Sequence, residues 1–132
     1  AIANGLKSFA IIKRLLDNGY MQEDSLFIID EPEVHLHPEW QLFFAELLVI
    51  LQMKLKLKML ITSHSPYFLQ AIEVFSKKYQ ISDTVHYYLA ERQEDGAIVR
   101  NVDNDLDATY KLLAQPIIKL REMYEALNDD NR

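Results

Sequence analysis

The sequence predicts an α/β fold in which parallel strands are flanked by helices, followed by a C-terminal β-hairpin and further helix. Apolar runs of strand type at residues 25–30 and 58–63 alternate with segments of helical apolar pattern. Such alternation is typical of parallel strands joined by right-handed crossovers. The first run ends in Asp30 and Glu31, and the second ends just before His64. Because ligands bind at the carboxyl ends of strands in such sheets, we expect these three side chains to gather at one edge.

The first element is expected to be a helix over residues 3–20, with Asn4 as its N-cap and Gly19 as its terminating residue. Its apolar side chains fall on one stripe at helical spacing: Leu6, Phe9, Ile12, Leu15 and Leu16. The run at 25–30 is short and evenly apolar, so it predicts a strand that is buried on both faces.

A second helix is expected to open at Pro38, because proline suits the first helical position. The alternating stretch at 53–58 is interpreted as a helix end, a loop and a strand start. The run at 58–63 then predicts a second buried strand. Pro66 opens a third helix, with Ser65 as its cap, that reaches about residue 77.

The C-terminal part predicts a hairpin over residues 84–102 that turns at Glu-Asp-Gly. A final helical region starts near Leu106 with Asp105 as its cap. Pro116 is expected to break or kink that region.

Length and composition restrict the class of protein. The 132 residues suit one domain or a piece of one, and 49 % are apolar, enough for a core. The net charge of −6 argues against a nucleic-acid footprint over the whole surface. There is no cysteine, and no apolar run is long enough to span a bilayer, so we expect a cytoplasmic location and no membrane partner. The chain starts at Ala1 rather than Met, which predicts a fragment of a longer protein.

The acids and the histidine suggest nucleotide chemistry. Asp30, at the end of a strand, is placed to hold magnesium directly or through water. Glu31, one residue further, can face an attacking water as its base or positioner. His64 can donate to a terminal phosphate or to that water. The structural alternatives are an exposed acid pair capping a turn with Pro32 and a histidine bonded to loop backbone.

The start of the first helix offers a second candidate site. Its first turn contains Asn4, Gly5 and Lys7 and no acidic residue. Helix N-termini carry partial positive charge, and a glycine allows a ligand close to the backbone. This composition suits an anion bound at the helix start, and an ordinary capped helix with a solvated lysine fits it equally well.

A zinc site is the rival hypothesis. His35 and His37 have the H-x-H spacing of metal ligands, with Glu33, Asp30 and Glu31 nearby. The alternative is that one histidine caps the second helix while the other faces a partner or solvent.

Together these motifs resemble the ABC-type ATPase heads of an AAA-like bacterial group, which includes the ATPase parts of overcoming-lysogenization-defect nucleases and of several anti-phage systems. "LFIIDEPE" resembles a Walker B strand with its glutamate, "VHLHPEWQ" the stretch that carries the D-loop, and "LITSHSPYFL" the switch strand with its histidine. "ANGLKSF" lies where the signature motif is expected, although Asn4 stands where a serine is usual. "LDATYKLLAQPIIKL" resembles the C-terminal helical end.

This resemblance implies that residues 1–132 are the C-terminal half of such a domain, hence a partial P-loop NTPase fold. The phosphate loop G-x-x-x-x-G-K-[ST] is missing from the sequence. In the roles that the resemblance implies, Asp30 assists Mg²⁺, Glu31 polarises the attacking water and His64 senses the terminal phosphate of ATP.

The resemblance also implies that heads pair head to tail around two ATP molecules. Asn4, Gly5 and Lys7 would then act on the nucleotide of the other subunit. We therefore expect a full-length ATPase that forms a homodimer, with this chain inactive by itself, and with a nuclease or DNA as further partner. The remaining hypotheses are a zinc hydrolase using His35 and His37, and a non-catalytic interaction module.

Overall fold

The computed structural model describes the backbone of residues 2–129 and the side chains of residues 5–129. The chain divides into two compact units, Ala1–Val85 and His86–Arg132. Each unit is therefore described by itself. Within the described residues, no helix is both long and apolar enough to cross a membrane.

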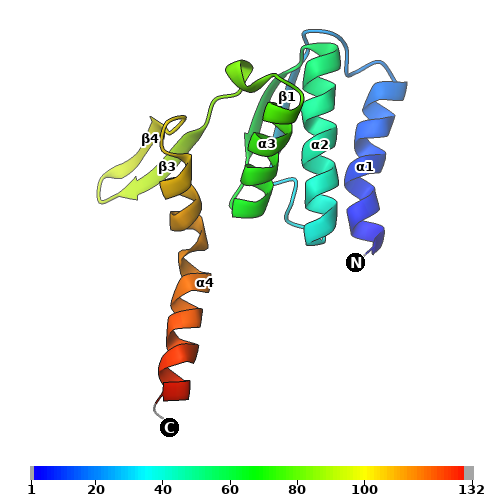
Figure 1. Ribbon diagram of the computed structural model, residues 1–132. Helices are drawn as coiled ribbons and strands as arrows, with labels where there is room; N and C mark the ends of the chain where they lie inside the picture. The colour runs from blue at the N-terminus through cyan, green and yellow to red at the C-terminus, as the bar shows by residue number, and fades with distance from the viewer. Residues whose placement is uncertain (1, 130–132) are drawn as a thin grey trace. The chain divides into compact units, whose positions relative to one another are not determined.

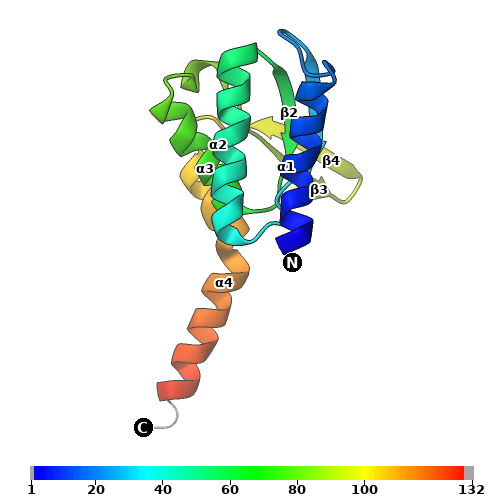
Figure 2. The same ribbon diagram turned by 90° about the vertical axis from the view of Figure 1, so that its right-hand side faces the viewer.

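Unit 1 alternates helices and strands in the predicted order (Figures 1 and 2). Its elements are α1 (Ile2–Asp17), β1 (Leu26–Asp30), α2 (Pro38–Leu55), β2 (Lys58–Thr62), α3 (Pro66–Lys78) and the short 3₁₀ helix η1 (Ser82–Thr84). Strand β1 pairs in parallel with β2, from Leu26 opposite Lys58 to Asp30 opposite Thr62. The parallel pairing expected from the alternation is therefore confirmed, and α2 is the crossover that it requires.

Helix α1 differs from the prediction at its start and agrees with it at its end. Asn4 lies inside the helix, so it is not the N-cap. Gly19 has a φ of 72°, and its N–H donates to Leu16 O at 3.1 Å. Tyr20 N–H donates to Leu15 O at 3.0 Å. These two bonds form a Schellman motif, so the terminating role of Gly19 is confirmed.

The core of unit 1 lies between the helices and one face of the sheet. The ring of Phe9 on α1 makes edge-on contacts with Trp40 and Phe44 on α2, at centroid distances of 5.5 and 5.2 Å. The buried cluster contains residues of α1, α2, α3 and the connecting loops: Ile12, Met21, Leu36, Phe44, Ala45, Leu48, Leu51, Leu57, Phe68 and Ala71. Phe27 and Ile29 pack against this cluster from β1. Burial of these apolar side chains holds the strands in place behind the site.

The other face of the two-stranded sheet is exposed. Leu26 and Ile28 are 69 % and 62 % exposed, and Leu60 on β2 is 57 % exposed. The prediction of strands buried on both faces is therefore wrong for unit 1. Alternate side chains of a strand point to opposite faces, and in unit 1 the helices cover one of them.

The connections near β2 follow the sequence closely. Lys56, with a φ of 53°, ends α2, so the stretch at 53–58 is a helix end, a loop and a strand start as predicted. The hydroxyl of Ser65 accepts from Phe68 N–H at 3.2 Å and caps α3, which confirms the predicted cap.

Unit 2 consists of the antiparallel hairpin β3 (Tyr88–Gln93) and β4 (Gly96–Asn101), followed by α4 (Leu106–Asp129). The hairpin is confirmed. Pro116 lies within α4 and does not end it, so of the predicted break or kink the break does not occur. A proline removes the hydrogen bond to the carbonyl four residues earlier. That carbonyl belongs to Leu112, which is exposed, so water can satisfy it.

Candidate functional site

The carboxyl ends of β1 and β2 bring the predicted acids and the predicted histidine together. Asp30 is the last residue of β1 and stands opposite Thr62 in the register. The Thr62 hydroxyl donates to Oδ1 of Asp30. Glu31 N–H donates to the carbonyl and to the hydroxyl oxygen of Thr62, both at 3.1 Å. The backbone of the acid pair is thus fixed to the end of the neighbouring strand.

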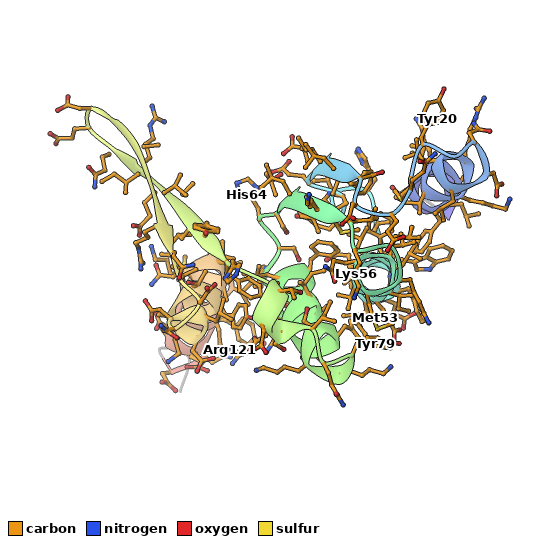
Figure 3. The ribbon with its side chains drawn as sticks, turned by 90° about the horizontal axis from the view of Figure 1, so that it is seen from above. Tyr20, Met53, Lys56, His64, Tyr79 and Arg121 are labelled. Atoms are coloured by element: carbon orange, nitrogen blue, oxygen red, sulfur yellow. The ribbon has the colours of Figure 1, made fainter. Side chains whose placement is uncertain are left out.

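Glu31 and His64 are in direct contact. Oε1 of Glu31 lies against Nδ1 of His64, and the two side chains are 36 % and 83 % exposed. Figure 3 shows His64 beside the strands of unit 1. The arrangement therefore presents a carboxylate and an imidazole to solvent at one point, where they can act together on a bound molecule.

The backbone at Glu31 is strained. Its φ is 45°, in the left-handed region that residues other than glycine rarely adopt. A non-glycine residue in this conformation costs of order 1–3 kcal/mol, and such residues cluster at functional sites. The strain turns the chain sharply at the end of β1, before Pro32. It thereby places the Glu31 side chain at the sheet edge rather than along the strand.

Glu33 is a further residue of the site that sequence analysis used only as a neighbour of the zinc candidate. It is 4 % exposed. Its Oε1 accepts from the Ser63 hydroxyl at 2.6 Å and from His64 N–H at 3.1 Å. The sequence signal that could have found it is the proline between two glutamates, because Pro32 reverses the chain and sends the second glutamate inward.

At the start of α1, where an anion site was predicted, Gly5 and Lys7 differ in their surroundings. The Cβ position of Gly5 is 3.7 Å from Leu36 and 3.8 Å from Trp40, so Gly5 is buried against the loop and helix that follow Glu31. Lys7 is exposed. The Asn4 side chain lies outside the described residues. Gly5 thus packs as a small core residue, and the described residues show no contact between Lys7 and Glu31 or His64.

Among the described residues, the structure gives no support to the zinc hypothesis. His35 and His37 are exposed, and the described part of the chain has no group of three or more His, Cys, Asp or Glu arranged to hold a metal ion. His37 precedes α2 but makes no side-chain capping bond, so the predicted histidine cap is absent at this position.

Asp30 fits a magnesium site of the kind found with nucleotides. Magnesium keeps several waters and is bound by one or two carboxylates together with the phosphates of the substrate, rather than by a cage of protein ligands. Asp30 offers a carboxylate at the sheet edge, already oriented by Thr62. The phosphates themselves would need a cradle of backbone N–H groups, and the sequence contains no phosphate loop.

Comparison with known proteins identifies a family. A family model described as AAA domain, putative AbiEii toxin, Type IV TA system, matches residues 4–70. These residues include Asp30, Glu31, Glu33 and His64, and all of them lie in unit 1. No curated protein and no solved structure matches the chain.

Proposed function

The chain belongs to this AAA-domain family, and from that premise we propose that it carries the water-activating part of an ATPase. The observation that carries the proposal is the contact between Glu31 and His64, beside Asp30, at the carboxyl ends of two parallel strands. AAA domains are nucleotide-binding domains, and such sheets bind ligands at this edge. Residues of these three types at this edge suit phosphoryl transfer to water.

Each residue has a role that its chemistry supports. Phosphoryl transfer depends on positioning and on charge stabilisation. Glu31 accepts a hydrogen bond from the attacking water and aligns it with the terminal phosphorus of ATP. His64, anchored against Glu31, donates to an oxygen of the terminal phosphate. Asp30 would hold a Mg²⁺ ion through its hydration shell, and the bound ion would supply positive charge to the phosphate oxygens.

The phosphate loop is proposed to come from a preceding half of the same protein, as in the ABC-type heads that the sequence resembles. In that arrangement two heads pair around MgATP. The start of α1, with Asn4, Gly5 and Lys7, then faces the nucleotide of the other head. Lys7 is exposed there and open to such a contact, whereas Gly5 is packed against Leu36 and Trp40 of its own chain. A nuclease or DNA is the partner on which such a dimer would act.

Two substitutions in the full-length protein test the proposal. Glu31→Gln keeps the side-chain shape but removes the carboxylate that accepts the hydrogen bond of the water. It is expected to lower phosphate release by about 100-fold or more while ATP still binds, so that a dimer accumulates in MgATP. Asp30→Asn is expected to weaken MgATP binding as well as turnover, because it weakens the magnesium contact.

The measurements are phosphate release, calorimetric binding of MgATP, and mass by size-exclusion chromatography with light scattering. The isolated chain of 132 residues serves as a control that lacks the phosphate loop. It is expected to bind ATP no better than millimolar. Micromolar binding of MgATP by that chain contradicts the placement of the phosphate loop outside it.

A further inference from the structure

We propose that Glu33 is a positioning residue that holds the His64 loop against the turn that carries Glu31. The inference rests on the proposed function, because it assigns to Glu33 the alignment of two side chains that are proposed to act on ATP. Its physical basis is a buried carboxylate that joins two loops about thirty residues apart in the sequence.

The first observation is that the acidic side chain of Glu33 is buried although one of its oxygens has no hydrogen-bond partner among the described residues. Glu33 is 4 % exposed, and its Oε2 is buried without a hydrogen-bond partner among the described residues. Burial of a polar atom without a partner is unfavourable, because the atom loses its hydrogen bonds to water and gains none in return. Carboxylates are therefore seldom buried in this way unless they hold other groups in place.

The second observation concerns the hydrogen bonds of Oε1, the other carboxylate oxygen of Glu33. Oε1 of Glu33 accepts from the Ser63 hydroxyl and from the backbone N–H of His64. The Ser63 hydroxyl oxygen in turn accepts from Ser65 N–H at 3.1 Å. One carboxylate oxygen thus fixes the three residues that leave β2, and His64 is the middle one.

A second set of hydrogen bonds connects the same two loops through Gln41 of α2. The Ser65 hydroxyl donates to Oε1 of Gln41 at 3.0 Å, and Nε2 of Gln41 donates to the carbonyl of Leu36 at 3.2 Å. Leu36 follows Glu33 in the loop between β1 and α2, and Leu36 N–H donates to Glu33 O at 2.9 Å. The loop that carries His64 is therefore bound directly to Glu33, and it is bound to Leu36 indirectly, through Gln41 of α2.

The consequence concerns the relative position of Glu31 and His64. Glu31 and Glu33 belong to one tight turn, because Val34 N–H donates to Glu31 O at 3.3 Å. The side chain of His64 is 83 % exposed, so side-chain packing fixes it little. Its backbone is fixed through Glu33 instead. Loss of Glu33 removes the hydrogen bonds that hold Ser63 and the His64 backbone. Asp30 at the end of β1 and Glu31 just after it stay bonded to Thr62.

The test compares Glu33→Ala, Glu33→Gln and Leu57→Ala in the full-length protein. Leu57 is 2 % exposed and precedes β2 at the end of the strand remote from His64, so Leu57→Ala destabilises the core without touching the loop. Misplacement of a reacting group by about 1 Å can cost up to 100-fold in rate. Glu33→Ala is expected to lower kcat for ATP hydrolysis by about 10- to 100-fold and to leave KM within about twofold. Glu33→Gln keeps an acceptor oxygen and is expected to retain kcat within about fivefold.

Hydrogen–deuterium exchange of residues 63–68 gives a readout that does not depend on ATP hydrolysis. Glu33→Ala is expected to raise the exchange of this segment at least tenfold, and Leu57→Ala is not. Unchanged exchange in Glu33→Ala overturns the positioning role. Glu33→Ala and Leu57→Ala could also lose kcat equally at an equal loss of thermal stability. Glu33 would then be a structural residue only, and the positioning role would be overturned. Parental hydrolysis by Glu31→Gln contradicts the proposed function instead, and the exchange result still decides whether Glu33 holds the loop.

Discussion

Among the described residues, unit 1 contains the pair His64–Glu31 and unit 2 the pair His86–Asp103, and the two pairs differ in how the carboxylate is bound. In unit 2, Asp103 accepts from His86 Nδ1 at 2.9 Å, from the Asn101 side chain at 2.9 Å and from Tyr87 N–H at 2.6 Å. In unit 1, the Glu31 side chain meets His64, and its backbone has a left-handed φ of 45°.

The bonding of Asp103 is that of a structural pair, whereas the function proposed above makes the pair in unit 1 the reactive one. Asp103 ties the residues that enter β3 to those that leave β4. The hydrogen bond from His86, followed by those from Asn101 and Tyr87, lowers the pKa of Asp103 to about 2. A carboxylate that is satisfied by three donors stabilises its unit and has little capacity left for a ligand. Glu31, which is strained and meets one imidazole at a strand end, has that capacity.

The largest expected difference between the pairs is in hydrolysis. His64→Ala in the full-length protein is expected to lower ATP turnover by about 100-fold, because a donor to the terminal phosphate is lost. The fold of unit 1 should persist, since the His64 side chain is mostly exposed. His86→Ala is the matched control and should leave turnover within about twofold. Equal losses in both variants contradict the distinction between the pairs.

The strain at Glu31 predicts an unusual stability effect. Glycine adopts positive φ without the penalty that other residues have there. The Glu31→Gly variant is therefore expected to be inactive and yet more stable than Glu31→Ala by about 1 kcal/mol. Urea unfolding of the two variants measures this difference. A less stable Glu31→Gly variant shows that the backbone at this position is not strained.

A smaller effect is expected from the pH dependence of the pair in unit 2. The pKa of Asp103 is lowered from its ordinary value of 3.8 to about 2, so the charged form is favoured by folding. Its contribution to stability is complete above pH 4 and is lost as the pH falls from about 4 to about 2. Asp103→Asn should therefore be less stable than the parent at pH 6, and the difference should narrow toward pH 2. Urea unfolding at pH 6, 4, 3 and 2 checks this, and a constant difference contradicts it.

The smallest effect is expected at the histidines of the zinc hypothesis. His35→Ala and His37→Ala remove exposed side chains and should each change the free energy of unfolding by no more than about 0.5 kcal/mol. Hydrolysis by the full-length protein should also stay at the parental rate. Mass spectrometry of the intact protein for bound zinc provides the check. If the parent protein binds zinc stoichiometrically and either variant loses it, the result contradicts this prediction and shows a metal site at these residues.

Sequence patterns predicted the elements of unit 1 and the edge at which its polar side chains meet. This succeeded because the alternation of strands and helices determines that β1 and β2 are parallel, and the parallel register places Asp30 opposite Thr62. Local signals were equally informative at Gly19 and Ser65, where one residue type satisfies a specific set of backbone groups.

The features that sequence analysis missed depend on contacts between distant residues. The burial of Glu33 is made acceptable by Ser63 and His64, which no local pattern links to it. An evenly apolar strand indicates that both faces avoid water, but it does not identify what covers each face, and in unit 1 the helices cover one. Pro116 was expected to break or kink the final helix, and the helix continues past it despite the loss of one hydrogen bond.

Single-turnover hydrolysis of bound ATP tests the distinction between the two pairs most directly. The full-length protein is compared with Glu31→Gln and with Asp103→Asn, each mixed with ATP and then with excess Mg²⁺. The account predicts that phosphate release slows by at least about 100-fold in Glu31→Gln and stays within about twofold of the parent in Asp103→Asn. Release at the parental rate by Glu31→Gln would show that the carboxylate beside His64 does not position the attacking water, and it would contradict the central claim.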